Sequence, residues 1–256
     1  DSKKLIEEAK RVLKLESESL ELTAKHLDQS FVDAVQCIFK SKGKVVVLGI
    51  GKSGLVGRKI SSTLASTGTP SICVHPVDCL HGDLGIFNNN DVVLAISHGG
   101  KTHELLELLP FIKMRKIPVI GITGSKESDI AKLSDIHIEV KIVKEACPLG
   151  LAPMSSTTAT LALGDALAAG LIQLRGFSRD DFAKLHPGGF LGKRLLLKVE
   201  NLMRPLVETP IVTLETPMKD VVLKITSHNL GATGVINELG ELVGVISDAD
   251  LRRHLE

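Results

Sequence analysis

Five short runs rich in Val and Ile alternate with helical stretches, and this alternation restricts the possible folds more than any other feature of the sequence. The runs cover residues 44–49, 71–74, 91–96, 118–123 and 135–140. Each run is apolar throughout, which is typical of strands covered on both faces. The pattern therefore predicts an α/β domain with a doubly wound parallel sheet, whose ligand site lies outside the carboxyl ends of its strands.

The first 41 residues have helical periodicity and contain neither Pro nor Gly. Their apolar stripe includes Leu5, Val12, Leu15 and Leu22. We expect one long helix over residues 2–41, with a break near residues 28–30 where Ser30 caps a second helix. Further helices are expected over residues 53–67, 102–116, 126–133 and 155–175.

The pattern changes near residue 200. Residues 199–256 predict an extended segment, a helix, a strand, a turn at 237–240, a strand and a final helix. Such a short unit hardly buries a core alone, so we expect it to need a second copy of itself. The sequence holds one copy, which leaves the pair incomplete. We therefore divide the chain into a domain of residues 1–198, including the N-terminal helices, and a small module of residues 199–256.

Composition argues against several classes of function. Lys and Arg number 31 against 30 Asp and Glu, and seven Phe are the only Phe, Tyr or Trp residues, so neither a basic surface nor a stacking platform for nucleic acid is expected. No apolar run reaches about 18 residues, which predicts no membrane span. The opening Asp-Ser-Lys-Lys lacks a signal core, and the four cysteines have no Cys-x-x-Cys spacing. We expect a cytoplasmic protein with cysteines buried as small apolar residues.

A glycine-rich turn follows the first predicted strand. A P-loop requires a glycine five residues before Gly51, where this chain has Val46. The spacing of Gly49, Gly51 and Gly54 matches the dinucleotide fingerprint in part, but residues 66–74 lack the acidic side chain that would bind a ribose. The turn therefore fits neither motif, but it fits a more general anion site. In such a site the glycines after a strand let the backbone approach a ligand, and the N-terminus of the following helix binds the anion.

Three loops carry hydroxyl groups and glycines that suit a phosphate group. The candidate phosphate-binding residues are Gly51 and Ser53; Ser97, Gly99, Gly100 and Thr102; and Ser155, Ser156 and Thr157. Each cluster alone is explained by helix capping. Because all three are expected at strand ends of one sheet, we favour binding of a phosphoryl group. The histidines have no recognised metal spacing, so no metal site is expected.

Three longer stretches resemble a known family. They read GIGKSGLVGRKISSTLASTGTPSICVHPVDCLHGDLG, KEACPLGLAPMSSTTATLALGDALA and FAKLHPGGFLGKRLL. These stretches closely resemble the arabinose-5-phosphate isomerases, in which a sugar isomerase domain precedes a pair of cystathionine-β-synthase-type repeats. The resemblance implies interconversion of D-ribulose 5-phosphate and D-arabinose 5-phosphate through an enediol, which supplies the precursor of the acid Kdo of lipopolysaccharide or capsule.

The resemblance also implies the catalytic residues, which are Lys52, His81, Glu104 and His186. Glu104 is expected to act as the base, Lys52 to stabilise the enediolate oxygen or hold the phosphate, and the two histidines to open the ring or move the hydroxyl proton. His75, His98 and His103 are further candidates. The family implies a homotetramer without a cofactor, in which a neighbouring subunit supplies one of the two catalytic histidines, and a nucleotide-like ligand at the C-terminal repeat.

One loop departs from the family pattern. Many members read Ser-Asn-Ser-Gly-Glu, whereas this chain reads Ser97, His98, Gly99, Gly100 and Lys101. Two alternatives stay open: a non-catalytic sugar-phosphate sensor, and an isomerase of another phosphosugar. No helix-turn-helix segment is predicted and all four catalytic positions are retained, so the enzyme is favoured over the sensor. The sequence leaves open the sugar, the branch of metabolism and the effect of the changed loop.

Overall fold

The computed structural model describes residues 2–189, 192 and 197–254. The chain forms two compact units, one within residues 1–196 and one within residues 197–256. The first holds the predicted parallel sheet and the second holds a small mixed sheet.

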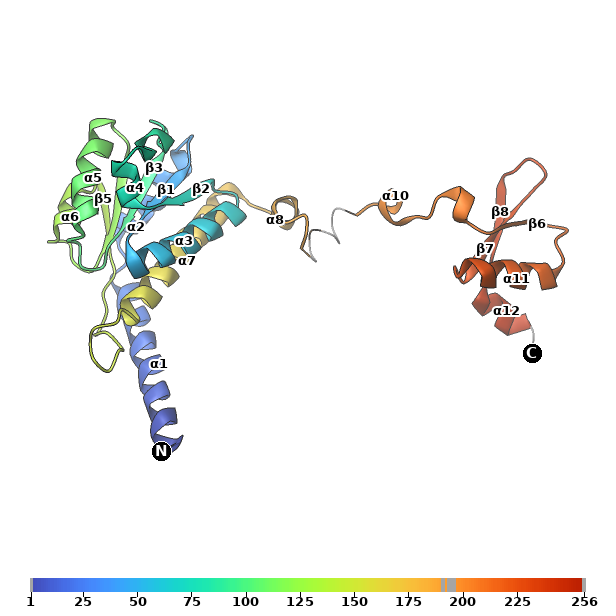
Figure 1. The fold of residues 1–256 in the computed structure, drawn as a ribbon, viewed down its shortest axis with the longest axis horizontal. Helices are drawn as coiled ribbons and strands as arrows, with labels where there is room; N and C mark the ends of the chain where they lie inside the picture. The colour runs from blue at the N-terminus through green and yellow to red at the C-terminus, as the bar shows by residue number, and fades with distance from the viewer. Residues whose placement is uncertain (1, 190–191, 193–196, 255–256) are drawn as a thin grey trace. The chain divides into compact units, whose positions relative to one another are not determined.

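The first unit is built on a five-stranded parallel sheet with the strand order β2-β1-β3-β4-β5 (Figure 1). The strands are β1 Val45–Leu48, β2 Ser71–Val74, β3 Val92–Ile96, β4 Val119–Thr123 and β5 Ile136–Glu139. All five predicted runs are confirmed as strands, and the α/β class with a parallel sheet is confirmed. The order reverses between β1 and β3, where one connection leads to β2 and the other to β4.

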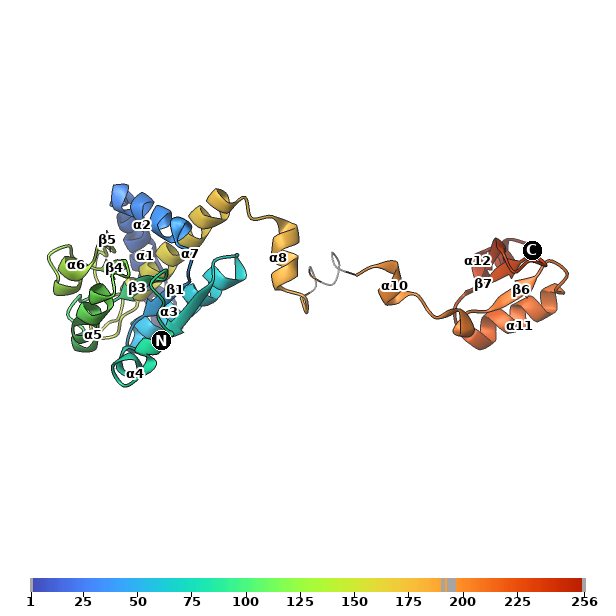
Figure 2. The same cartoon turned by 90° about the horizontal axis from the view of Figure 1, so that it is seen from above.

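Helices cover both faces of this sheet (Figure 2). The described helices of this unit are α1 Ser2–Lys25, α2 Gln29–Lys40, α3 Gly51–Ser66, α4 Pro76–Leu80, α5 His103–Met114, α6 Asp129–Leu133 and α7 Ser155–Arg175, with a short 3₁₀ turn η1 at Asp83–Ile86; α8 Arg179–Leu185 follows α7 and does not cover the sheet. A hydrophobic core lies on each face of the sheet, and alternate residues of β1 point into one core or the other. Val45 and Val47 pack with α2, α3 and α7, whereas Val46 and Leu48 pack with α4, α5 and α6. Both faces are therefore buried, which accounts for the unbroken apolar runs.

The predicted break near residues 28–30 is confirmed, because α1 ends at Lys25 and α2 begins at Gln29. The predicted cap is wrong, because α2 is capped by Asp28 rather than Ser30. The Asp28 carboxylate accepts hydrogen bonds from the backbone N–H of Ser30 at 2.9 Å and from its hydroxyl at 2.6 Å. An ionised carboxylate at a helix N-terminus also stabilises the helix dipole, so the acidic residue is the stronger cap.

Helix α7 is the one described helix that is long and apolar enough to cross a membrane by length and composition. It packs against α1, α2 and α3 in the first unit. Its buried residues include Ala159, Leu163, Leu167 and Leu171. Packing between these helices accounts for its apolar character.

A buried ion pair closes the amino-terminal end of the sheet. The Asp91 side chain is 1% exposed and lies 2.7 Å from the ammonium of Lys44. It also accepts hydrogen bonds from the backbone N–H of Lys44 at 2.9 Å and of Asn88 at 2.8 Å. Burial raises the pKa of Asp91, but these hydrogen bonds outweigh it and hold the pKa below its usual value.

We expect Asp91→Ala to lower the free energy of unfolding by roughly 2–4 kcal/mol, because two backbone donors and an ammonium lose their partner. The matched control is Asp165→Ala, whose exposed pair with Lys59 should contribute less than about 1 kcal/mol. Urea unfolding of both variants measures the difference. Since the folded pKa of Asp91 is depressed, its contribution is present above the unfolded value of about 3.9 and is lost as pH falls through the folded pKa. Equal unfolding midpoints for the two variants would contradict this expectation.

The second unit begins with α10 Val199–Leu202 and the 3₁₀ turn η2 Leu206–Glu208, followed by β6 Ile211–Thr213, α11 Met218–His228, β7 Ala232–Ile236, β8 Leu242–Ser247 and α12 Asp248–His254. Strand β7 pairs in parallel with β6 and antiparallel with β8. The predicted order of elements is confirmed. Five buried residues form its core, Val212, Val221, Ile225, Val235 and Leu251. This core is small, as expected for a unit of this length.

Candidate active site at the carboxyl edge of the sheet

The strand order places the candidate site between β1 and β3. In a parallel sheet with this order, ligands bind where the order reverses, outside the carboxyl ends of the two central strands. Lys52 is the second residue of α3, which follows β1, and Glu104 is the second residue of α5, which follows β3. His81 ends α4, which follows β2 on the other side of β1. Three predicted catalytic residues therefore come from three neighbouring strands at one edge.

The glycine-rich turn leaves the N-terminus of α3 open. Gly51 adopts a φ of +58°, and Ile50 at the cap position makes no side-chain hydrogen bond to the helix. A Cβ at Gly49 would lie 2.9 Å from the backbone of Ser53, and a Cβ at Gly54 would lie 2.7 Å from the Gly49 carbonyl. The spacing that resembles a dinucleotide fingerprint thus serves close packing of the strand end against the helix, with free N–H groups beside it.

Hydrogen bonds of its own hydroxyl groups hold the loop between β3 and α5 together. The oxygens of Ser97 and Thr102 lie 2.7 Å apart, and the backbone N–H of Gly100 donates to the Ser97 oxygen at 3.1 Å. Gly100 has a φ of +64°, and a side chain there would collide with Ser128. Gly99 is exposed, with open space where a Cβ would stand. The two predicted phosphate hydroxyls are therefore engaged with each other in this loop.

The N-terminus of α7 forms the third predicted loop. Ser155 and Ser156 are buried, and the Ser155 hydroxyl has no partner among the residues that the structure describes. Thr157 donates to the carbonyl of Met154 at 2.9 Å. The carboxylate of Glu145 accepts from the backbone N–H of Met154 at 2.7 Å and lies 3.5 Å from that of Ser156. Sequence reasoning missed Glu145, which caps α7 from outside the helix.

A small cavity is lined by residues from all three of these loops. It measures about 30 Å³ and is lined by Ser53, Val56, His98, Pro153, Ser156, Thr157 and Thr160. The structure thus brings together Ser53, Ser156 and Thr157 as predicted. His98 is the residue of the loop after β3 that lines this cavity. The other predicted phosphate-binding residues do not line it, and they are Gly51, Ser97, Gly99, Gly100, Thr102 and Ser155. Burial lowers the pKa of His98, while the nearby Glu145 carboxylate opposes this shift.

The four catalytic candidates are not paired with one another. Among the described residues, no hydrogen bond or ion pair joins any two of Lys52, His81, Glu104 and His186. Lys52 and His81 are exposed, whereas Glu104 is half-buried. Lys52, His81 and Glu104 all follow strands at the carboxyl edge of the sheet, so they lie on the same side of the domain without pairing directly.

His186 is held by its own helix at the far end of α7. Its Nδ1 donates to the carbonyl of Phe182 at 2.8 Å, and its ring stacks on Phe182 with 3.8 Å between centroids. Helix α7 is about 30 Å long by its helical rise, with Ser155 at its start. Helix α8 lies beyond the other end of α7 in both views (Figures 1 and 2). The described chain therefore does not bring His186 to the other three residues.

The four cysteines differ in their burial and in the pKa of their thiols. Burial raises the pKa of Cys79 to about 11, as expected for a buried thiol. Cys147 is half-buried, and the backbone N–H groups of Ala152, Leu151 and Leu149 lower its pKa. Cys37 and Cys73 are half-buried as well, so the prediction that all four cysteines are buried apolar residues is right for Cys79 and wrong for the other three. Within the described parts of the chain, no group of three His, Cys, Asp or Glu side chains could hold a metal ion.

Two family models match the chain. Residues 38–170 match the SIS domain, and residues 199–256 match the CBS domain. Together with the parallel sheet and the residues at its edge, these matches define an SIS-domain protein of the sugar isomerase class that carries a CBS domain.

Comparison with individual proteins narrows this class. The chain is 49% identical over 244 residues to arabinose 5-phosphate isomerase KdsD of Escherichia coli K12, covering 95% of this chain and 74% of that protein. It is 48% identical over 251 residues to KdsD of Pseudomonas aeruginosa, covering 98% of this chain and 77% of that protein. A solved structure of E. coli CFT073 c3406 in complex with arabinose 5-phosphate is 39% identical, with a TM-score of 0.71, over 73% of this chain and all of that one. The chain belongs to the arabinose 5-phosphate isomerase family, and the predicted resemblance is confirmed.

Proposed function

We propose that the chain interconverts D-ribulose 5-phosphate and D-arabinose 5-phosphate through an enediol and so feeds Kdo biosynthesis. The observation that carries this proposal is the 49% identity to KdsD over 95% of the chain. The geometry supports it, because Lys52 and Glu104 begin the helices that follow the two central strands. Hydroxyls that suit a phosphate line a cavity at the starts of α3 and α7.

The reaction assigns a task to each residue. A base must take a proton bound to carbon, and a positive or hydrogen-bonding group must stabilise the enediolate oxygen that forms. We assign the base to Glu104 and the stabilising charge to Lys52. His81 and His186 open the sugar ring or move the hydroxyl proton, since imidazole exchanges protons near neutral pH. The reaction moves a hydrogen within one molecule, so it needs no redox cofactor.

Product analysis tests the function. The protein is incubated with ribulose 5-phosphate in D₂O, and the products are identified by carbon and proton NMR. We expect arabinose 5-phosphate that carries deuterium at C2. Ribose 5-phosphate or another phosphosugar as the product would point to a different isomerase. Binding without turnover would point to a sugar-phosphate sensor.

The assembly that we propose is a homotetramer in the cytoplasm. Near its start, α1 exposes the apolar side chains of Leu5, Ile6 and Leu13, which are 72%, 56% and 67% exposed. An apolar stripe of this kind is stabilised by packing against another helix. All four cysteines are unpaired, which fits a reducing compartment.

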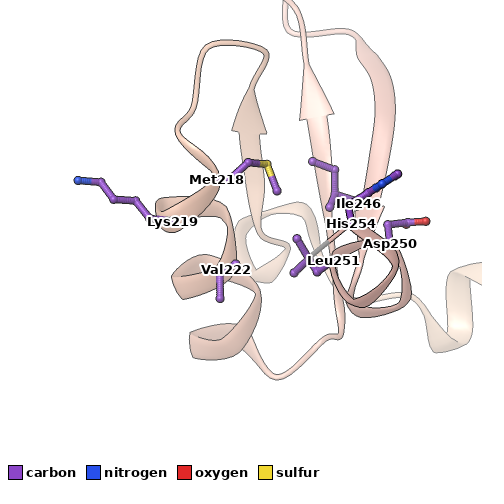
Figure 3. Close-up of a pocket in the computed structure, with 7 residues that line it drawn as sticks. All are labelled: Met218, Lys219, Val222, Ile246, Asp250, Leu251 and His254. Carbon is purple, nitrogen blue, oxygen red and sulfur yellow. The ribbon is translucent and has the colours of Figure 1, made fainter. Parts of the chain in front are cut away.

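For the second unit we propose a regulatory role with a nucleotide-like ligand. A cavity of about 650 Å³ opens between α11 and α12 (Figure 3). It is lined by Met218, Lys219, Val222, Ile246, Asp250, Leu251 and His254. Its apolar wall with a few charged groups suits a planar ring that carries phosphate.

A chain ending at Lys198 should keep its turnover because all four assigned catalytic residues precede that point. Steady-state kinetics at a concentration where the oligomer is intact, checked by sedimentation, measures this. A large loss of turnover in an intact oligomer would show that the second unit takes part in catalysis.

A further inference from the structure

Thr123 is the last residue of β4, and its hydroxyl group is the centre of a buried polar network. The hydroxyl donates to the carbonyl of Ser125 at 2.8 Å, and the backbone N–H of Ser125 donates back to Oγ1 at 3.3 Å. Oγ1 also lies 3.0 Å from the hydroxyl of Ser128 and 2.8 Å from Nε2 of His137. One hydroxyl therefore joins the end of β4 to the turn at residues 124–128 and to the neighbouring strand β5.

The direction of each hydrogen bond in this network follows from the chemistry of the groups. A threonine hydroxyl has one proton to donate, and the carbonyl of Ser125 can only accept it. The hydroxyl of Ser128 and Nε2 of His137 must then donate to Oγ1, so the imidazole carries a proton on Nε2. Without the Thr123 hydroxyl, two donors and a carbonyl would lose their partner in the protein interior, where an unpaired polar group is costly.

The 124–128 turn and the start of α6 support the loop between β3 and α5. The backbone N–H of Gly124 donates to the carbonyl of His98 at 2.8 Å, and that of Ile130 donates to the carbonyl of Gly100 at 3.1 Å. Gly100 also packs directly on Ser128, where a side chain on the glycine would collide. All three contacts involve the backbone of the loop, so the position of the loop depends on the position of the turn.

The supported loop leads directly into α5. Thr102 occupies the cap position of this helix, and Glu104 is its second residue. A general base must lie within hydrogen-bond reach of the proton that it removes. A displacement of about 1 Å can reduce a rate by roughly 100-fold. A fixed loop therefore matters for the position of Glu104.

We propose that Thr123 is a positioning residue, whose buried hydroxyl holds the 124–128 turn and thereby the loop that leads to Glu104. Thr123 acts through the backbone of this loop and does not act on the substrate itself. The proposal rests on the proposed function in taking Glu104 as the base of the isomerisation.

The test compares Thr123→Val with Thr123→Ser. Valine keeps the shape of threonine without its hydroxyl, whereas serine keeps the hydroxyl without the methyl group. We expect Thr123→Val to reduce kcat/KM for ribulose 5-phosphate by roughly 10- to 100-fold, with the larger share in kcat. Thr123→Ser should lose less than about fivefold, because its hydroxyl can make the same hydrogen bonds.

Amide hydrogen exchange tests the support of the loop without any substrate. The N–H groups of Gly124 and Ile130 donate to the loop, and that of Gly100 belongs to it. In Thr123→Val these groups should exchange roughly tenfold faster than in the wild type, because the turn and the loop open more often. If the hydroxyl contributed only to overall stability, local opening of the loop would not change, and neither would these rates.

Thr69→Val is the matched control. Thr69 is also buried, but its hydroxyl has no hydrogen-bond partner in the part of the chain that the structure describes. It precedes β2, at the opposite edge of the sheet. The same substitution there should leave the kinetics and the exchange of the loop unchanged. Should Thr123→Val not fold, His137→Leu removes one donor from the same network. It should show the same loss relative to His137→Gln, whose amide can donate from a similar position.

Three results would overturn the proposal. They are wild-type kinetics in Thr123→Val, unchanged exchange of the loop in that variant, and equal losses in Thr123→Val and either Thr123→Ser or Thr69→Val. A wild type that does not isomerise ribulose 5-phosphate would instead refute the proposed function. The exchange measurement would then decide by itself whether Thr123 holds the loop.

Discussion

Glu104→Gln should reduce isomerisation by roughly 10²- to 10⁴-fold, almost entirely in kcat. Glutamine keeps the size and the hydrogen-bonding reach of the side chain but cannot accept a proton from carbon at neutral pH. Binding should change little, because the phosphate is held by hydroxyls on other loops. Exchange of the C2 proton with D₂O should disappear together with product formation, since both need the same proton transfer.

The matched control is Glu107→Gln, which changes an exposed carboxylate one turn further along α5. It should keep activity within about threefold of the wild type, far inside the loss expected for a missing base. If Glu104→Gln were equally active, Glu104 would serve only the helix dipole. The base would then have to be sought among His81, His98 and His186.

A mixture of two inactive variants should regain activity. The described chain leaves His186 beyond the far end of α7, so we expect each site to combine Lys52 and Glu104 of one chain with His186 of another. When Glu104→Gln and His186→Ala subunits assemble at random, about one quarter of such shared sites contain both intact residues. Refolding the two variants together and assaying the mixture should therefore restore about a quarter of the wild-type rate.

The control for this experiment mixes Lys52→Ala with Glu104→Gln. Both residues belong to the same edge of one sheet, so no site in the mixture has both intact and no recovery is expected. Recovery in this control, or none in the first mixture, would show that the four residues are not divided between chains in this way. Sedimentation of each mixture establishes that the subunits have assembled.

The sheet and its site could be predicted because they depend on local signals. Strands buried on both faces require unbroken apolar runs, and the carboxyl ends of parallel strands meet at one edge whatever the loops contain. Placing Lys52 and Glu104 after β1 and β3 therefore followed from the order of elements. The cap of α2 was assigned to Ser30 because both Asp28 and Ser30 are good capping residues, and the sequence does not show which backbone turns first.

Other parts of the site depend on contacts between distant segments. Glu145 caps α7 from a loop, at a spacing that no capping motif describes. His98 could be noted as a candidate, but its hydrogen bond with Gly124 depends on where β4 ends relative to β3. The distance of His186 from the other residues follows from the length of α7 and the direction of α8, neither of which a motif encodes.

Helix α7 has a consequence for the evolution of this chain. Its first turn carries the hydroxyls of the site, and its last turn starts the segment that leads to His186. A single inserted residue near its middle would rotate everything beyond it by about 100° and shift it by about 1.5 Å. The position of His186 relative to the hydroxyls at the start of α7 would then change, even if every side chain were kept. The number of residues in α7 should therefore be more strongly constrained than the identity of its exposed residues, whereas the turn at 237–240 can change in length without this effect.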